Sequence, residues 1–427
     1  MDGRVIADGE VLVRGGEIAE VGRGIARLHP HEEVRDLGQA ALLPGFVNAH
    51  CHIEPTFMRG RLDGLNLWDW ISALGFRGDS APSGQVLAAS ALVGAIECAR
   101  SGITCLGDAS YSGGAAALGA VSAVGLRAVV YREIFGQSMG SEYRARFARA
   151  LDEVRSLQLN TSPLVTIGLS PHSVYASNPE VLGLCADVDV PVCVHLAETA
   201  AETDYCLRGE GPIADMRSRM GYEPMVSGLR PVGVLREAGL LKRGVCLAHC
   251  VHVSDEEIRL TAGSGASVAH CARSNAYLGA GAAPVPRMLD AGGVVGLGTD
   301  SAASCLRLDF FEEMRFALGI HRALAQEAGV LRAKDALTLA TVGGARALGL
   351  ADRIGTLETG KRADMVAVDL RGHLPGEDVF VSVVRRGPSD VVMALVDGEE
   401  IVREGRPTRV DIAEAQAALS GVMEQQS

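Results

Sequence analysis

Aromatic side chains are scarce in this sequence: Phe, Trp and Tyr make up 4% of its 427 residues, and two of them are tryptophan. The core must therefore be built mainly from Ala, Val, Leu and Ile. Basic residues are also in the minority, with 40 Lys and Arg against 52 Asp and Glu, for a net charge of −12. No cluster of Lys and Arg stands out, and phosphate-binding surfaces need such clusters. We therefore expect no nucleic-acid partner.

Long apolar runs and paired cysteines are absent as well. No stretch reaches the roughly 18 apolar residues that a membrane span needs. Residues 1–22 lack the basic-then-apolar pattern of a secretion signal. The ten cysteines are scattered without a Cys-x-x-Cys pair, which is typical of small buried hydrophobic residues in a reducing compartment. We expect a cytoplasmic protein that has no membrane partner.

Glycine, by contrast, is abundant, with 52 residues where average usage of about 7% would give far fewer. It follows no Gly-X-Y period and forms no low-complexity block. The high apolar content, 48% of the chain, excludes disorder. The glycines therefore indicate a folded chain with many short strands, helices and turns.

The two ends of the chain resemble each other and differ from its middle. Residues 1–43 and 356–410 consist of short β-branched runs separated by tight turns, such as the Gly-Gly turn at 15–16. This pattern predicts that both ends contribute to one small composite β-sandwich domain. Residues 411–427 predict a polar helical tail.

The middle, residues 44–355, alternates apolar strand runs with segments of helical period. Strands are expected at 165–169, 190–195, 245–249, 266–270 and 294–298, and helices at 83–101, 142–156 and 309–327. Repeated β-then-α units over this length predict a TIM-like (β/α)₈ barrel in the α/β class. In such barrels, active sites are built where the strands end.

Metal-ligating residue types occur at the ends of several expected strands. His50 and His52 project from one face of the first strand, because side chains alternate along a strand. Later strands end at His195, His249 and Asp300. Imidazole and carboxylate groups suit a divalent cation. One His-x-His pair can arise by chance, but four strand ends that converge on one axis predict a metal site.

These motifs carry a family resemblance. The run PGFVNAHCH at 44–52, the segment His195-Leu-Ala-Glu198, and the segment Gly298-Thr-Asp300 are together similar to the amidohydrolase superfamily. The similarity is to its branch of cytosine, guanine and S-adenosylhomocysteine deaminases and triazine hydrolases. The resemblance implies a barrel with a terminal β-sandwich, a homodimer, and one divalent ion, zinc or iron. The ligands it implies are His50, His52, His195 and Asp300.

Three residues are candidates for catalysis. Asp300 can accept a proton from the attacking water, and the resemblance places His249 beside the metal. Glu198 follows His195 by three residues, so its carboxyl group can reach a substrate ring and protonate a ring nitrogen. The family carries the same His-x-x-Glu arrangement in its deaminases. A solvated loop carboxylate or a helix cap is the alternative for Glu198.

Substrate contacts are predicted in the loops after the strands. Trp68 is a candidate ring-stacking residue, whereas we expect Trp70 to pack its helix onto the barrel. His172, in the segment Ser-Pro-His-Ser-Val-Tyr, matches a substrate-contacting loop of S-adenosylhomocysteine-type deaminases. Glu54 is a candidate acceptor for a ribose or a histidine, with a surface carboxylate as the alternative.

Two further substrate candidates are charged. Glu133 ends the third strand and is a candidate to face the pocket, although a surface pair with Arg132 fits the sequence equally well. Arg273 lies where a 6-aminodeoxyfutalosine deaminase-like loop is expected, and a guanidinium suits a substrate carboxylate. An ordinary place at the barrel rim is its alternative.

The remaining histidines receive no role in the chemistry. We expect structural roles for His252 and His270, and surface positions for the others: His29, His31, His321 and His373.

The sequence thus favours a metal-dependent deaminase of an adenosine derivative or a purine-like ring. The alternatives are a triazine or guanine-type hydrolase of a bare ring, a cyclic-amide hydrolase, and a metal-binding barrel without activity. The cyclic-amide hydrolases commonly use a carboxylated lysine, and none is evident here.

Overall fold

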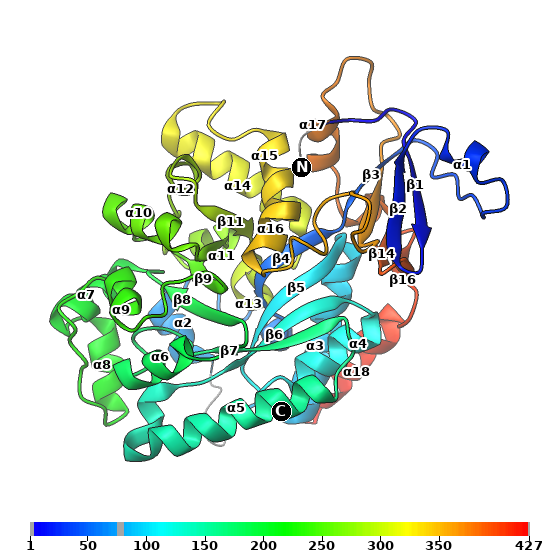
Figure 1. The fold of residues 1–427 in the computed structure, drawn as a ribbon. Helices are drawn as coiled ribbons and strands as arrows, with labels where there is room; N and C mark the ends of the chain where they lie inside the picture. The colour runs from blue at the N-terminus through cyan, green and yellow to red at the C-terminus, as the bar shows by residue number, and fades with distance from the viewer. Residues whose placement is uncertain (1–3, 75–80, 426–427) are drawn as a thin grey trace.

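The computed structural model describes residues 4–74 and 81–425, and its centre is a curled sheet of parallel strands (Figure 1). Nine strands follow the order β11-β10-β9-β8-β7-β6-β5-β4-β12. They are β4 (Phe46–His52), β5 (Ile103–Ser110), β6 (Arg127–Glu133), β7 (Val165–Ser170), β8 (Val192–Leu196), β9 (Val245–His249), β10 (Ser267–His270), β11 (Val294–Leu297) and β12 (Asp300–Ser301).

The last strand segment closes this sheet on itself. β12 follows β11 after only Gly298 and Thr299, and it pairs with β4 in parallel register, so that Asp300 lies opposite Cys51. All eight residues of β5 are buried, as expected for a parallel strand that is covered on both faces. These features confirm the TIM-like barrel predicted from the sequence.

Helices surround the barrel strands, as Figure 1 shows. They include α3 (Gly84–Arg100), α4 (Ala115–Val124), α5 (Tyr143–Leu159), α6 (Pro179–Ala186), α7 (Ala200–Arg208), α9 (Pro231–Glu237), α10 (Asp255–Ser264), α12 (Val285–Asp290) and α14 (Phe310–Ala325). Caps visible in the sequence begin several of them: the side chain of Ser83 accepts the N–H of Val86, and that of Asp309 accepts the N–H of Phe311. The long helices predicted from the sequence lie within a few residues of these bounds.

Short helices follow the strands, and three of them, η1, α2 and α11, carry candidate site residues. They are η1 (Glu54–Met58), α2 (Leu67–Ala73), η3 (Gly136–Glu142), α8 (Pro212–Arg219), α11 (Ala272–Tyr277) and α13 (Ala302–Cys305). Two more short helices, α15 (Ala333–Thr338) and α16 (Gly344–Ala347), come after the barrel strands in the chain. A third, α17 (Val379–Val384), belongs to the terminal region. Within the described residues, no helix is long and apolar enough to cross a bilayer.

Small residues fill the interior of the barrel. One buried cluster contains Val47, Ala49, Cys105, Val129, Tyr131, Cys193, Cys246 and Ala269, which alternate with the outward-facing positions of their strands. Tyr131 is its aromatic member, so a sequence that is poor in aromatics still fills the space. All ten cysteines are buried and unpaired, as the sequence predicted.

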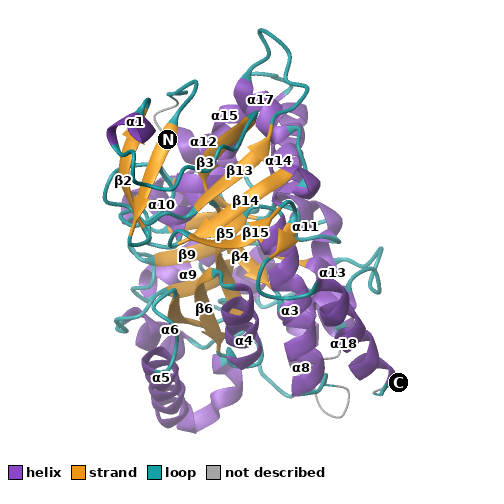
Figure 2. Cartoon of the chain, turned by 90° about the vertical axis from the view of Figure 1, so that its right-hand side faces the viewer, coloured by secondary structure: helices purple, strands orange, loops and turns teal. Residues whose placement is uncertain are grey.

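Both chain ends contribute to small antiparallel sheets beside the barrel (Figure 2). A five-stranded sheet has the order β16-β15-β14-β13-β3, which joins β3 (Ala40–Pro44) to β13 (Met365–Asp369), β14 (Val391–Val396), β15 (Glu399–Arg403) and β16 (Arg406–Pro407). A hairpin of β1 (Glu10–Arg14) and β2 (Glu17–Gly22) forms the other sheet. Ile18 and Met365 share a buried cluster that connects the two sheets.

Charge pairing ties these sheets to the barrel. The guanidinium of Arg127, at the start of β6, is buried and donates to Asp364 at 2.7 Å and also to Asp397. The C-terminal helix α18 (Ile412–Glu424) packs against α3 on the barrel's outer layer. The division into domains at residues 43, 355 and 410 stays a prediction.

Candidate metal centre and active site

Three strands bring four metal-ligating side chains together. His50 and His52 come from β4, His195 from β8, and Asp300 from β12. The Nε2 atoms of His52 and His195 lie 3.1 Å apart. Oδ1 of Asp300 lies 3.5 Å from Nε2 of His52 and 3.7 Å from Nε2 of His50. The four ligands predicted from the sequence therefore surround one small volume at the C-terminal end of the barrel.

Backbone carbonyls fix the tautomers of two of these rings. The Nδ1 atom of His52 donates to the carbonyl of Ala109 at 2.6 Å, and that of His195 donates to the carbonyl of His172 at 2.9 Å. Each Nε2 therefore carries a lone pair. Two lone pairs that face each other at 3.1 Å repel, and a cation between them relieves the repulsion.

The remaining donor atoms fit the same cation. Nε2 of His50 is buried and has no hydrogen-bond partner among the described residues. Burial lowers the pKa of His50, His52 and His195, which keeps the rings in the neutral form that binds metals. Burial alone would raise the pKa of Asp300, but the neighbouring histidines and a hydrogen bond from Ser274 lower it to about 2. The donor set suits a divalent metal such as zinc.

Serine hydroxyls orient the carboxylate of Asp300. Oδ2 accepts hydrogen bonds from Ser274 at 2.5 Å and from Ser304 at 3.0 Å, which leaves Oδ1 toward the histidines. Ser274 belongs to the segment His270–Asn275, whose role the sequence left open. The expected strand ends identified Asp300, but only the packing of α11 and α13 shows what holds it.

Glu198 and His249 form the next layer of the site. Both are buried, and Oε1 of Glu198 lies 3.7 Å from Nδ1 of His249. Nδ1 of His249 donates to Oδ1 of Asn275 at 2.9 Å, so its Nε2 is available on the side of the metal ligands. Burial and the charge of Asp300 raise the pKa of Glu198 well above its usual range. A surface position for Glu198 is wrong.

The backbone at this end of the barrel is strained. Left-handed φ angles occur at non-glycine residues beside several strand ends: His172 (35°), Ala197 (51°), His249 (75°), Cys250 (49°) and Asp300 (59°). Residues with a Cβ atom pay about 1 kcal/mol or more for this conformation. The concentration of such residues around the predicted ligands is typical of a functional site.

Aromatic rings line one side of the histidines and form what we call the aromatic wall, namely Trp68, Tyr175, His172 and Phe135. The ring of His172 stacks on that of His195 with centroids 4.7 Å apart. Phe135 and Tyr175 contact His172 at centroid distances of 4.8 and 5.9 Å, and Trp68 meets Tyr175 edge-on at 5.3 Å. The sequence indicated Trp68 and His172 but not the two rings that connect them to the site.

Trp70 packs in the way that the sequence predicted. Its side chain is buried and its Nε1 donates to the carbonyl of Ala303 at 3.3 Å, which joins α2 to α13.

Two buried glutamates lie behind and beside His52. Glu54 is 2% exposed. Its carboxylate accepts hydrogen bonds from the hydroxyls of Ser110 and Ser112 and from the backbone N–H of Ser112. Its surface alternative is therefore wrong, and its carboxylate is already held by the protein. Glu133 offers an oxygen within 4.8 Å of ligand atoms of His52 and His195. Its Oε1 atom has no partner among the described residues.

The predicted surface pair of Glu133 with Arg132 does not form. Arg132 instead bonds Glu153 at 2.6 Å. A hollow of about 270 Å³ lies at this end of β6, and Glu133 shares its lining with Arg132, Arg146, Arg149 and Glu153.

Arg273 is engaged by the protein. Its guanidinium donates to the carbonyls of Asp309 (3.1 Å) and Cys305, and it pairs with Glu312 at 3.2 Å. These contacts hold α11 against α14. Because its donors are directed into this packing, we do not include Arg273 in the proposed substrate site.

His321 is not on the surface, which corrects the expectation from the sequence. It is 3% exposed on α14, and its Nε2 lies 3.1 Å from Nε2 of His270 at the end of β10. The other structural assignment fits, since His252 bonds the carbonyl of Ala280 at 2.8 Å. Sequence spacing did not reveal the pair because β10 and α14 are far apart in the chain.

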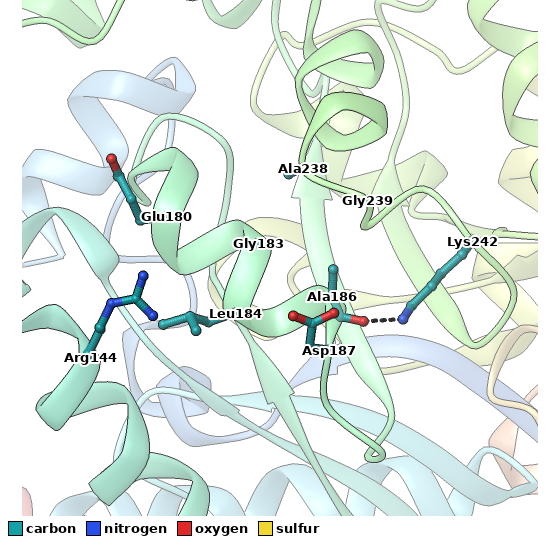
Figure 3. Close-up of a pocket in the computed structure, with 9 residues that line it drawn as sticks. All are labelled: Arg144, Glu180, Gly183, Leu184, Ala186, Asp187, Ala238, Gly239 and Lys242. Atoms are coloured by element: carbon teal, nitrogen blue, oxygen red, sulfur yellow. Dashed lines mark hydrogen bonds between the residues drawn. The ribbon is translucent and has the colours of Figure 1, made fainter.

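Another hollow, of about 540 Å³, lies away from the candidate residues. Figure 3 shows it between α6, Arg144 at the start of α5, and the loop after α9, where Lys242 donates to the carbonyl of Ala186. None of the predicted site residues lines it. It has no part in the metal centre.

The barrel and the convergent ligands together define a metal-binding hydrolase scaffold. The amidohydrolase family profile matches residues 41–401. The 5-methylthioadenosine/S-adenosylhomocysteine deaminase of Nitratidesulfovibrio vulgaris is 34% identical over 98% of this chain and 93% of its own length. The chain therefore belongs to the amidohydrolase family, which confirms the resemblance seen in the sequence.

Solved structures agree with this assignment. A zinc-bound adenosine deaminase of Xanthomonas campestris is 30% identical, with a TM-score of 0.84 over 99% of this chain and 95% of its own. The atrazine chlorohydrolase of Arthrobacter aurescens, also solved with zinc, is 25% identical, with a TM-score of 0.85 over 98% of this chain and 96% of its own.

Proposed function

We propose that this enzyme is a metal-dependent deaminase that replaces the exocyclic amine of an adenosine derivative by oxygen, with one zinc ion held by His50, His52, His195 and Asp300. The observation that carries the proposal is the buried carboxyl group of Glu198 beside this ligand set, 3.7 Å from His249. The names of the relatives point to 5′-thio-substituted adenosines as the substrate class.

The proposed chemistry needs a proton acceptor and a proton donor. A bound divalent ion supplies Lewis acidity and lowers the pKa of a water molecule toward neutrality. Asp300, whose pKa is about 2, is ionised and can accept the proton of that water. His249, with its Nδ1–H held by Asn275, can orient the same water or the ring through Nε2.

Glu198 is suited to the opposite step. Burial and the charge of Asp300 raise its pKa, which favours the protonated form of the carboxyl group. It can therefore donate a proton to the ring nitrogen as the carbon–oxygen bond forms. Asp300 then passes the water proton to the amine, which leaves as ammonia, and the remaining hydroxyl proton returns to Glu198 as the carbonyl forms, so that both carboxyl groups regain their starting states.

The aromatic wall supports a planar ring as the substrate. Trp68, Tyr175, His172 and Phe135 place apolar ring surface next to His195, where a purine can pack in offset or edge-on contact. Glu133, whose Oε1 has no partner among the described residues, is a candidate acceptor for substrate N–H or hydroxyl groups.

The arginine-lined hollow supports a substrate with an anionic tail. Its lining holds Arg132, Arg146 and Arg149 together with Glu133 and Glu153, and Arg132 pairs with Glu153. Glu133 also belongs to the surroundings of His52. A guanidinium pairs well with a carboxylate. S-adenosylhomocysteine carries a carboxylate on its 5′ substituent, whereas methylthioadenosine does not. We therefore favour S-adenosylhomocysteine between the two.

An ammonia-release panel on the purified, metal-analysed protein tests the proposal. It contains adenosine, S-adenosylhomocysteine, methylthioadenosine, 6-aminodeoxyfutalosine, guanine and melamine. Atrazine is tested beside them with chloride release as the readout, because it has no free amine to leave as ammonia. We expect turnover of the adenosine derivatives and none of atrazine. Turnover only of guanine, melamine or atrazine would replace the proposal by a bare-ring hydrolase, and no turnover of any aminated ring would contradict it.

The choice of substrate is tested by Arg146→Gln. We expect kcat/KM for S-adenosylhomocysteine to fall up to about fivefold, the value of a partly exposed charge pair, with methylthioadenosine unaffected. Arg144→Gln is the matched control, because Arg144 lies on the same helix but does not line this hollow. An equal loss for both substrates would contradict the carboxylate contact.

A further inference from the structure

Glu202 has contacts that its position in the sequence does not predict. It lies in the first turn of α7 and is 1% exposed. Its Oε2 atom accepts the backbone N–H of Glu198 at 3.0 Å, and its Oε1 atom is buried without a hydrogen-bond partner among the described residues. The carboxyl group therefore reaches back past the start of its own helix to the loop that carries the proposed proton donor.

The helix α10 shows what the same sequence pattern normally does. There, Ser254 accepts the N–H of Glu257 at 3.2 Å, and Glu257 accepts the N–H of Ser254 at 2.8 Å, which forms a capping box. Thr199 and Glu202 have the same spacing at the start of α7. Yet the side chain of Thr199 makes no capping bond, and Glu202 accepts the N–H of Glu198, the residue before Thr199. Glu202 therefore bonds the loop before α7 and does not form a capping box with Thr199.

This loop needs to be held. Ala197 has a left-handed φ of 51°, which costs a residue with a Cβ atom about 1 kcal/mol or more. On one side Glu202 accepts the N–H of the next residue, Glu198, and on the other the N–H of His252 donates to the carbonyl of Ala197 at 2.8 Å. The turn clamped in this way separates His195 from Glu198 and sets the direction in which the carboxyl group of Glu198 points.

We propose that Glu202 is a positioning residue that clamps the Ala197–Glu198 turn and thereby holds the carboxyl group of Glu198 against His249 and the substrate ring. The inference rests on the proposed function, in which Glu198 transfers the proton. Burial also raises the pKa of Glu202 to about 8.

The test compares Glu202→Ala, Glu202→Gln and the matched control Glu257→Gln, each measured for kcat, KM, bound metal and thermal midpoint. We expect Glu202→Ala to lower kcat about 10- to 100-fold, the usual effect of removing a group that orients a reacting residue. KM and metal content should stay within about twofold of the wild type, since roughly uniform substrate binding is retained. Glu202→Gln should recover most of kcat, because its amide oxygen still accepts one N–H.

Glu257→Gln should lower the thermal midpoint and leave kcat per folded, metal-loaded subunit unchanged. If Glu202→Ala behaves like this control, the group is merely structural and the inference is wrong. If Glu202→Ala does not fold, Glu202→Asp takes its place, because its shorter side chain withdraws the carboxylate from the turn. A kcat loss of about tenfold or more in the folded, metal-loaded Glu202→Asp variant supports the inference, and a kcat equal to that of the wild type overturns it.

The wild type and Glu198→Gln are measured beside these variants. Together they distinguish a failure of the proposed function from a failure of the positioning role of Glu202. A wild type without ammonia release, or a fully active Glu198→Gln, contradicts the proposed function. A large loss in Glu198→Gln with no loss of kcat in Glu202→Ala contradicts the positioning role alone.

Discussion

Two groups of buried histidines lie in the same barrel, and each contains a pair of Nε2 atoms 3.1 Å apart. In the first group, His52 and His195 face each other, and His52 also lies 3.5 Å from Asp300. In the second, His270 and His321 face each other, and neither belongs to a group of three metal-capable side chains in the described part of the chain. The distance between two imidazoles therefore does not identify a metal site by itself.

The atoms on the far side of each ring explain the difference. Nδ1 of His52 and of His195 each donates to a backbone carbonyl, so that both Nε2 atoms are acceptors and need a cation between them. Nδ1 of His270 has no partner among the described residues, so its proton can reside on Nε2 and form a hydrogen bond to His321. The first pair needs a metal, and the second is satisfied by one proton.

The largest predicted effect comes from removing a ligand of the first group. His195→Ala should lose the bound ion and lower ammonia release by roughly 10³-fold or more, since a metal contributes several kcal/mol to such transition states. Metal per subunit and kcat are the measurements. His321→Gln, in the second group, should keep both, and an equal loss of metal in the two variants would contradict the comparison.

Glu198→Gln separates binding of the ion from catalysis within the first group. The variant keeps the shape of the side chain but has no acidic proton. We expect full metal content and a loss of about 10²- to 10⁴-fold in kcat, the usual contribution of a general acid. The same rate with a full complement of metal would exclude Glu198 as the proton donor.

The second group should be visible in the pH dependence of stability. Burial lowers the pKa of His270 well below its usual value and that of His321 to about 4. The unfolded chain therefore binds more protons between pH 4 and about 6.5, so the folded state loses stability as the pH falls through this window. Each neutral histidine contributes at most about 1.4 kcal/mol per pH unit.

His321→Gln removes one of these titrating groups without removing a ligand of the metal. In urea unfolding at pH 6.5, 5.5 and 4.5, the variant should lose less stability on acidification than the wild type, by about 1 kcal/mol per pH unit. The metal-dependent loss is common to both proteins and cancels in the difference. If the free energy of unfolding falls equally with pH in the wild type and in His321→Gln, then His321 takes up its proton in the folded protein as readily as in the unfolded chain.

The sequence was informative wherever the chemistry depends on local spacing. Strand alternation placed His50 and His52 on one face, and the ends of the expected strands identified His195, His249 and Asp300. The bounds of β9 match the expected strand at 245–249. The β-rich ends predicted sheets shared by both termini, and β3 indeed pairs with β13.

Partners brought by distant elements were beyond such reasoning. The burial of His321 depends on how α14 packs against β10, and the contacts of Arg273 with Cys305 and Asp309 depend on α13 and α14. Similarly, Ser110 and Ser112 hold Glu54 only because β5 lies beside β4. The cytoplasmic location and the homodimer stay predictions.

The left-handed residues at the strand ends have a consequence for engineering. Glycine at Ala197 would relieve the clash of the Cβ atom, but it would also add freedom to the unfolded chain. Its net effect on the melting temperature should therefore be small, while the loop before Glu198 would gain mobility. A library selected for heat resistance alone would then accept glycine at this position and accumulate sluggish enzymes. A screen that scores turnover together with thermostability would keep the alanine.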